Sequence, residues 1–426
     1  MPKTLRIGFV FGLLALAAAG CEKKEEAKDE PAEAPAEAAE EKGPDLVGID
    51  MEAKKVTIGA LNDESGPAAT IGKPYAVGKR MLVDAVNAGD VDALPDGWTI
   101  ELVEKDHGYN PQKSVQHYDA IKNDVLFIAT SFGTPNTLPL VDMLKKDEMV
   151  AFPASLSSEM AKNRHTPPLG PSYEVEAMRA MDWAVQDAGE AGKVKAGIVY
   201  QQDDYGKDGL SGWKEAADHH DVEIVSEQSI APGETDVTAA ITSLKEKGAN
   251  YVLLTTLPST TGPILGTAAQ LKYAPKWLGN TPAWIDGFFE PETIPPAVFD
   301  DFRWVTGLTY WGEEDVDGMD DFLEVYEKHG KDKAEPDYYI LASYAQGIVE
   351  LEALRRAIDK GPVTRAAYLE ALQSIDSFDA GGMFQEVDLS KFPYLTSDQT
   401  RVLEPDLDER TWEQVADYAS PEAKQE

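Results

Sequence analysis

The stretch from Leu126 to Ser158 constrains the fold more than any other part of the chain. An apolar run at 126–129 leads into a loop of small and hydroxyl residues, 130–137, and a segment with helical apolar spacing follows this loop. A second apolar run, 149–152, ends in another small polar loop. Two such units in direct succession are typical of a parallel α/β sheet, in which both loops lie at the carboxyl ends of neighbouring strands.

Both loops carry side chains that suit a small anionic ligand. Their hydroxyl and amide groups can donate hydrogen bonds, and a helix N-terminus adds unpaired N–H groups and the positive end of a dipole. In the alternative interpretation these side chains only cap the following helix, as Thr and Asn often do in such loops. The sequence alone leaves both interpretations open. The candidate donors are Thr134, Asn136, Thr137 and Ser155.

Strands and helices alternate along the rest of the chain in two series. The first series predicts strands at 55–61 and 98–103 and helices at about 72–87 and 110–123. The second predicts strands at 194–200, 222–225, 251–254 and 276–279 and helices at 209–219, 238–247 and 263–271. Two such arrays in series predict two α/β lobes with a cleft between their strand ends, and a cleft of this kind is a preferred site for small ligands.

The first 21 residues have the character of a secretion signal. Lys3 and Arg6 precede an apolar segment, 7–17, which is too short to be a good membrane span, and a run of small residues ends at Cys21. The pattern resembles a bacterial lipoprotein signal, in which the cysteine becomes the acylated first residue of the mature chain. The alternative is an ordinary secretory signal with an incidental cysteine. We expect lipidation at Cys21 and a periplasmic or cell-surface location on a bacterial membrane.

The segment after the predicted signal is strongly acidic. Residues 22–50 hold eleven acidic and four basic residues and almost no apolar bulk, so they cannot bury a core. We therefore expect a disordered acidic tether over residues 22–53. The acidity is not confined to this tether, because the whole chain has a net charge of -37. Such a charge excludes nucleic acid as a partner.

The sequence lacks the common short patterns of catalytic and nucleotide-binding sites. It has no dinucleotide-binding or phosphate-binding glycine loop and no G-x-S-x-G turn. None of its six histidines stands at a spacing typical of metal ligands. We therefore expect no enzyme activity, no cofactor and no metal. A hydrolase on the same fold is kept as a separate hypothesis, because catalytic residues that are far apart in the sequence can come together in the folded protein.

Seven segments resemble the leucine/isoleucine/valine-binding family of type I periplasmic binding proteins, which serve ABC importers. Together they lie within residues 54 to about 390. In chain order they are IGALNDESGPAATIG, VEKDHGYNPQKSVQHYDAIKND, SFGTPNT, FPASLSS, VYQQDDYGKDGLSGWKEAA, PGETDVTAAITSLKEKGANYVLL and LASYAQGIVELEALRRA. The resemblance implies an α/β fold of two doubly wound parallel-sheet lobes joined by a three-strand hinge. Lobe 1 would comprise 54–170 and 309–382, and lobe 2 would comprise 171–308 and 383–420.

The resemblance also implies which residues bind the ligand. The opening loop would hold a carboxylate, the next strand end would add contacts, and Tyr205 of the Tyr-Gly pair would close over the ligand from lobe 2. Amino-acid binders of the family often have an acid at about Thr281, which this chain lacks. The expected ligand-binding residues are Ser131, Phe132, Thr134, Asn136, Thr137, Ala154, Ser155, Tyr205, Thr256, Thr281, Trp284 and Asp286.

The missing acid bears on the ligand's charge. A buried ammonium group normally needs a paired carboxylate, and the nearby candidates are Asp203, Asp204 and Asp286. Either Asp286 replaces the missing acid, or the ligand is not an α-amino acid. Trp284 and Phe132 could form an apolar wall, although Trp284 could equally pack inside lobe 2.

The resemblance implies a receptor that captures a small solute and delivers it to an ABC permease in the inner membrane. A branched-chain or related amino acid is the first candidate ligand, and an amide or small aromatic carboxylate is the second. The alternative function is a ligand-sensing subunit of a signalling system with the same fold. We expect a monomer whose partners are its small-molecule ligand, the permease and, through a lipid anchor, the membrane.

Overall fold

The computed structural model of the protein describes residues 46–290, 295, 298–395 and 397–424. The predicted signal with Cys21 lies outside the described residues, as does the predicted tether up to residue 45. The chain divides into one unit of Met1–Gly43 and a second of Pro44–Glu426, and all described residues belong to the second. Within this described part, no helix combines the length and the apolar character needed to cross a bilayer.

The strands form two separate sheets. In the first, β2 pairs in parallel with β3 and with β4, and β4 pairs in parallel with β5. In the second, parallel strands follow the order β10-β9-β8-β6-β7, and β11 and β12 continue the sheet in antiparallel fashion beyond β10. The strands are β1 (Ile49–Asp50), β2 (Lys55–Asn62), β3 (Thr99–Asp106), β4 (Ile128–Phe132), β5 (Ala151–Ala154), β6 (Lys195–Gln201), β7 (Glu223–Ile230), β8 (Tyr251–Thr255), β9 (Lys276–Asn280), β10 (Phe302–Thr306), β11 (Thr400–Asp406) and β12 (Thr411–Ala419).

Helices cover the sheets and separate the strands in sequence. They are α1 (Ala69–Ala88), α2 (Pro111–Ile121), α3 (Thr134–Thr137), α4 (Val141–Lys146), α5 (Tyr173–Ala188), α6 (Asp204–His220), α7 (Thr238–Lys247), α8 (Pro258–Gln270), α9 (Met319–His329), α10 (Tyr338–Lys360) and α11 (Arg365–Leu372). Strands β4, β8 and β10 are buried along their whole length, as expected for parallel strands with helices on both faces.

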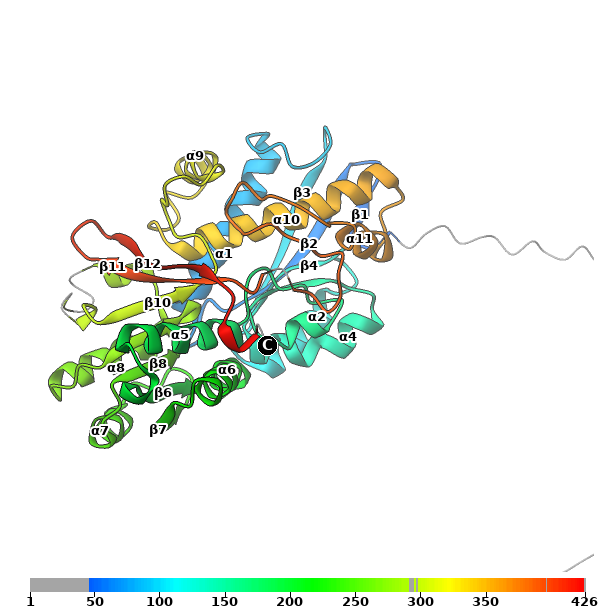
Figure 1. The fold of residues 1–426 in the computed structure, drawn as a ribbon. Coiled ribbons are helices and arrows are strands. Elements are labelled where there is room, and N and C mark those ends of the chain that lie inside the picture. The colour runs from blue at the N-terminus through cyan, green and yellow to red at the C-terminus, as the bar shows by residue number, and fades with distance from the viewer. Residues whose placement is uncertain (1–45, 291–294, 296–297, 396, 425–426) are drawn as a thin grey trace, which may run out of the picture. The chain divides into compact units, whose positions relative to one another are not determined.

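The chain returns to the first sheet after it has built most of the second. Helix α10 packs along α1, and α11 packs on α10, so that residues far apart in sequence share one lobe. Figure 1 shows α10, in orange, against the blue and cyan elements of the first lobe, and the red strands β11 and β12 beside β10. The predicted fold of two doubly wound parallel-sheet lobes is therefore confirmed.

The chain crosses between the lobes three times, as expected, but the crossing segments, where described, are not strands. The chain passes between the sheets at 155–172, 307–318 and 373–399. The described residues of these segments form no strand, and their single ladder contact is an isolated bridge between Phe378 and Val387. Prolines contribute to this irregularity, since they cannot donate to a strand ladder and 155–172 contains three of them.

The predicted tether ends earlier than the sequence suggested. Residues 46–53 were expected to be disordered, yet Ile49 and Asp50 form β1 and pair antiparallel with the first residues of β2. Gly48, with φ 74°, lies so close to the backbone of Leu126 that no side chain would fit there. The fold therefore begins with these residues and not at residue 54.

Prolines explain two further differences in helix bounds. The segment with helical apolar spacing after the opening loop forms a short 3-10 turn at Leu138–Leu140 and then α4, because Pro139 lacks the N–H group that a continuous helix would use, and α3 lies before it within the loop. Helix α8 begins at Pro258 and not at Pro263, because proline is well suited to the first helical turn.

Candidate functional site

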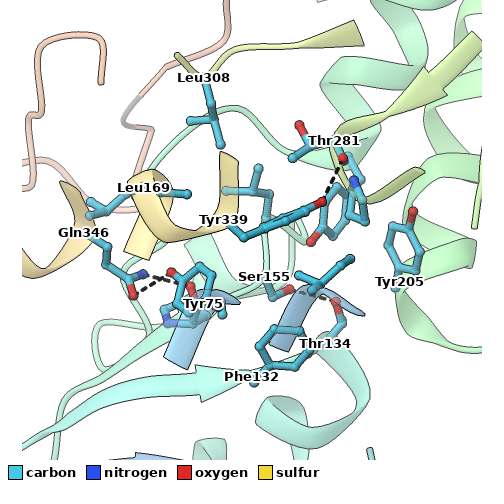
Figure 2. A pocket seen from close by; sticks show the side chains of 18 of the residues that line it. Tyr75, Phe132, Thr134, Ser155, Leu169, Tyr205, Thr281, Leu308, Tyr339 and Gln346 are labelled. Carbon is cyan, nitrogen blue, oxygen red and sulfur yellow. Dashed lines mark hydrogen bonds between the residues drawn. The ribbon is translucent and has the colours of Figure 1, made fainter. Parts of the chain in front are cut away.

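A cavity lies between the two lobes at the carboxyl ends of their strands. It offers about 80 Å³ to the centres of water molecules, several times the roughly 10–15 Å³ that one buried water needs. The cavity is lined by Ile71, Tyr75, Tyr109, Phe132, Gly133, Thr134, Pro153, Ala154, Ser155, Leu156, Leu169, Tyr173, Tyr205, Leu257, Thr281, Pro282, Leu308, Tyr338, Tyr339, Ala342, Gln346 and Phe384. Figure 2 shows side chains from both lobes and from the long helix α10 converging on it.

The ends of β4 and β5 supply one hydroxyl pair of the cavity wall. Because Phe132 pairs with Ala154, the residues that follow the two strands lie side by side. The hydroxyl groups of Thr134 and Ser155 are 2.7 Å apart and hydrogen-bonded, as Figure 2 shows. Gly133 allows this turn, since its φ is 86° and a Cβ there would meet Asn136 at 2.9 Å.

Helices α1 and α10 supply a second polar pair. The Tyr75 hydroxyl donates to Oε1 of Gln346 at 2.8 Å, and Nε2 of Gln346 donates to the carbonyl of Pro153 at 3.1 Å. The Tyr75 ring also meets the ring of Phe132 edge to face, with centroids 6.1 Å apart. These contacts fix the Gln346 amide by both of its ends and join α10 to the end of β5.

The second lobe contributes Tyr205 and Thr281 to the wall. The Tyr205 hydroxyl donates to Oδ1 of Asn280 at 2.8 Å, so its ring faces the cavity while its hydroxyl is held within its own lobe. The backbone N–H of Thr281 donates to Oε2 of Glu176 at 2.9 Å, and its hydroxyl donates to Oε1 of the same carboxyl group. Burial raises the pKa of Glu176 to about 8, although these hydrogen bonds oppose the shift.

Two tyrosines at the N-terminus of α10 complete the wall. Asp337 caps this helix by accepting from the N–H of Tyr339 at 2.8 Å. The Tyr339 hydroxyl donates to the carbonyls of Thr281 at 3.1 Å and Trp284 at 3.2 Å, and thereby links the two lobes. The Tyr338 hydroxyl is buried and has no hydrogen-bond partner in the described structure.

Two contacts hold the lobes together at the edge of the cavity. The Ser259 hydroxyl of α8 donates to the carbonyl of Pro67 at 2.9 Å. The Tyr109 hydroxyl accepts from Nε2 of Gln201 at 3.1 Å and lies 3.3 Å from a carboxylate oxygen of Asp203. The lobes are therefore in contact around the cavity.

Half of the residues expected from the sequence reach the cavity. They are Phe132, Thr134, Ala154, Ser155, Tyr205 and Thr281. The structure does not bring Ser131, Asn136, Thr137 and Thr256 to it. The hydroxyl groups of Ser131 and Thr137 bond to each other at 2.8 Å, and the hydroxyl of Thr256 bonds to that of Thr261 at 2.7 Å. The Asn136 amide donates to the carbonyl of Phe132 at 3.2 Å, so these side chains shape the strand ends from within.

Trp284 and Asp286 are also absent from the cavity wall. Trp284 is fully buried in an aromatic cluster that includes Phe289 and Trp412, with ring centroids at 4.9 and 4.5 Å. Asp286 accepts from Nε1 of Trp284 at 3.1 Å and from the N–H of Tyr338 at 2.7 Å. Asp286 therefore holds the start of α10 and does not line this cavity.

The other two acids that the sequence offered as ammonium partners lie outside the wall as well. Asp203 caps α6 through the N–H of Gly206 at 3.1 Å and accepts from Gln201 at 2.5 Å. Asp204 is exposed and pairs with Lys207 at 3.5 Å. Neither residue is among those that line the cavity.

Sequence reasoning missed the α1 and α10 face of the cavity. Tyr75, Tyr338, Tyr339 and Gln346 all line it. A usable signal was present, since Tyr338, Ala342 and Gln346 recur every four residues and so share one helix face. The Asp-Tyr-Tyr start of that helix also has a good N-cap residue.

One group of side chains in the described part of the chain could hold a metal ion. Ligand atoms of His219, His220 and Glu422 lie within 4.8 Å of one another. His219 and Glu422 are exposed, and His220 already contacts Asp182 at 2.6 Å. None of the three lines the cavity.

Comparison with known proteins places this geometry in a family. Residues 55–391 match the family described as periplasmic binding protein. A Leu/Ile/Val-binding protein homolog 3 from Brucella melitensis biotype 1 is 24% identical over 204 residues, which span 46% of this chain and 53% of that protein. An amino acid binding protein from Pseudomonas aeruginosa is 21% identical over 336 residues, which span 76% of this chain and 85% of that protein.

Among solved structures, a fatty acid ABC transporter substrate-binding protein from Thermomonospora curvata has a similar fold. Its TM-score is 0.82 at 24% identity, and the superposition covers 89% of this chain and 95% of that one. The resemblance to leucine/isoleucine/valine-binding proteins seen in the sequence is thereby confirmed. The match over 55–391 and the two lobes around one cavity show that the chain belongs to the periplasmic binding protein family.

Proposed function

We propose that this protein is the substrate-binding component of an ABC importer. It would capture one small organic solute in the cavity between its lobes and present it to a membrane permease. The observation that carries the proposal is the cavity itself, since both lobes line it at their strand ends and meet around it. A solute held there would stabilise the closed form, and a permease that recognises this form would receive loaded protein in preference to empty protein.

The ligand would contact the residues of both lobes that line the cavity. Thr134 and Ser155 offer hydroxyl groups, and Phe132 and Tyr205 offer ring faces. The two relatives are named for amino acids and the similar structure for a fatty acid. Together with the alternative from the sequence, these names give two ligand classes, a branched-chain or related amino acid and an acid or amide without an amino group.

Lipidation at Cys21 would keep the protein at a bacterial membrane, in the periplasm or at the cell surface, as a monomer next to its permease. The proposal rests on the signal-like residues 1–21 that end at this cysteine. Cys21→Ser should move the protein from the membrane fraction to the soluble fraction after cell breakage. A variant that still sediments with membranes would refute the lipid anchor.

A ligand screen tests the proposed capture directly. The purified protein, freed of bound solute by dialysis, should melt at a higher temperature with one class among amino acids, amides and small aliphatic or aromatic acids. A ligand at a hundredfold excess over its dissociation constant adds about 2.7 kcal/mol to the free energy of unfolding. Deletion of the gene should then abolish uptake of the same compound. If the protein binds the compound but cells without the gene still take it up, the ligand-sensing function would be favoured.

A further inference from the structure

The cavity wall in the described structure contains no charged side chain. Its lining consists of apolar residues, six tyrosines, two threonines, one serine, one glutamine and one glycine, with no Asp, Glu, Lys, Arg or His. An α-amino acid would bring both an ammonium group and a carboxylate into this space. A buried ammonium group is costly unless acceptors, normally including a carboxylate, surround it.

Two of the acids that hydrogen-bond to lining residues, Glu176 and Asp203, have their carboxyl oxygens occupied behind the wall. Both carboxyl oxygens of Glu176 accept from Thr281, whose side chain separates this acid from the cavity. Since the pKa of Glu176 is raised to about 8, it is mostly uncharged at pH 7 and gives no counter-charge to an ammonium group. Asp203 accepts from Gly206 and Gln201 at the start of α6.

Neutral acceptors along the wall are also occupied. Oε1 of Gln346 accepts from Tyr75, and the carbonyl of Pro153 accepts from Gln346. The carbonyl of Thr281 accepts from Trp304 and from Tyr339. The carbonyl of Ala154 accepts from the N–H of Gly133. A ligand with donor groups would therefore find few free acceptors.

Donors, in contrast, are in excess. The Tyr338 side chain is 1% exposed, and its hydroxyl alone among the polar side-chain groups of the described lining has no partner. A buried donor without an acceptor costs about 1–3 kcal/mol. The Ser155 hydroxyl bonds to those of Thr134 and Tyr173, so these three groups hold three protons and their two hydrogen bonds use two of them. An oxygen acceptor on the ligand would satisfy these spare hydroxyl protons.

We propose that the cavity takes a carboxylic acid anion or its amide with an apolar body and no ammonium group, and that the Tyr338 hydroxyl is a specificity-determining donor to its oxygen. This inference rests on the proposed function. Hydrogen bonds can hold a carboxylate without a cation, because they favour its charged form. The aliphatic body would lie against Ile71, Leu156, Leu169, Leu257 and Leu308.

The experiment compares ligands that differ only at the head group. The probes are L-leucine, 4-methylpentanoate and 4-methylpentanamide, and L-phenylalanine, 3-phenylpropanoate and 3-phenylpropanamide, each titrated calorimetrically into the purified full chain. In at least one series the acid or the amide should bind at least tenfold more tightly than the amino acid. The acid and amide arms show which head group is preferred.

Tyr338→Phe tests the assigned donor. It should weaken binding of the preferred probe about tenfold while the melting temperature of the ligand-free protein stays the same or rises, because an unpaired polar group is removed. Tyr273→Phe is the matched control, since the Tyr273 hydroxyl donates to Ala249 at 2.7 Å and this residue does not line the cavity. The control should lower the melting temperature and leave affinity unchanged.

The outcomes separate the inference from the function on which it rests. Equal or tighter binding of the amino acid in both series would overturn the inference and leave the proposed capture intact. Unchanged affinity in Tyr338→Phe would overturn the role of that hydroxyl. If none of the six probes binds, the inferred head-group class is overturned, and the broader ligand screen described above decides whether the proposed capture stands.

Discussion

Helices α1 and α10 meet through two side-chain pairs that are four residues apart on each helix. At the cavity, Tyr75 bonds to Gln346 and the pair is neutral. One turn farther along, Lys79 bonds to Glu350 at 2.6 Å, and both side chains are at most 2% exposed. The same interface therefore buries an ion pair in the core and only neutral groups at the cavity. The fold can accommodate buried charge, so the uncharged cavity wall does not result from a limit of the scaffold.

The pKa values of the charged pair show how strongly burial acts there. Burial lowers the pKa of Lys79 and raises that of Glu350 to about 7, although each group favours the charged form of the other. Desolvation is the larger effect on both groups. A lone charge at either position would therefore be far less stable than the pair.

The largest expected effect comes from breaking the charged pair. Lys79→Met leaves Glu350 buried without a partner and should lower the free energy of unfolding by about 3–5 kcal/mol, measured by urea denaturation. The double variant Lys79→Met with Glu350→Leu should recover most of this loss, because no uncompensated charge remains. A loss below about 1 kcal/mol in the single variant would show that the pair contributes little.

The next largest effect comes from placing a charge at the neutral pair. Gln346→Glu gives the cavity a carboxylate and removes the donor to Pro153, so it should lower the free energy of unfolding by about 1–3 kcal/mol. Titration calorimetry should show the preference for 4-methylpentanoate over L-leucine falling at least tenfold. Gln270→Glu adds the same charge at an exposed position on α8 and should change neither quantity. An unaltered preference in Gln346→Glu would refute the link between wall charge and ligand class.

A pH series probes the buried acid behind Thr281. The pKa of Glu176 is about 8 in the folded state against an ordinary value of 4.5. Between these values the unfolded chain loses the proton that the folded chain keeps, so stability should fall as pH rises from about 4.5 to 8. Glu176→Gln should flatten this fall and recover roughly 1–2 kcal/mol at pH 8, with little change at pH 4.5. Parallel curves for the variant and the parent would contradict the assignment.

The smallest expected effect is the loss of one neutral hydrogen bond. Tyr75→Phe removes the donor to Gln346 but keeps the ring contact with Phe132. The free energy of unfolding should fall by about 0.5–1.5 kcal/mol. If Tyr75→Phe lowered the free energy of unfolding as much as Lys79→Met, the neutral pair would contribute as much to stability as the charged pair, and the contrast between them would fail.

Local patterns in the sequence were sufficient to predict the two lobes and part of the cavity wall. Apolar runs followed by hydroxyl loops identified β4 and β5, and adjacent parallel strands necessarily bring their ends together. Thr134 and Ser155 were therefore predictable as neighbours, and their hydroxyls do meet. Such an argument identifies a strand end but not which side chains of the loop turn outward, and Asn136 and Thr137 turn into the fold instead.

The rest of the cavity depends on long-range packing. Helix α10 follows the second lobe in sequence and returns to α1 more than 250 residues away, as the contact between Tyr75 and Gln346 shows with its separation of 271 residues. Its tyrosines therefore gave no local sign of a binding wall. Trp284 and Asp286 were expected at the ligand from residue type alone, yet an aromatic cluster and a helix start use both of them.

The short strand β1 fixes where the chain enters the first lobe relative to the cavity. Residues 49 and 50 pair with the first residues of β2, whereas the cavity lies beyond the last residues of β4 and β5. The described chain thus enters the first sheet at the end opposite the cavity. A lipid anchor of the kind proposed at Cys21 would therefore connect to the first lobe at the end that lies away from the cavity.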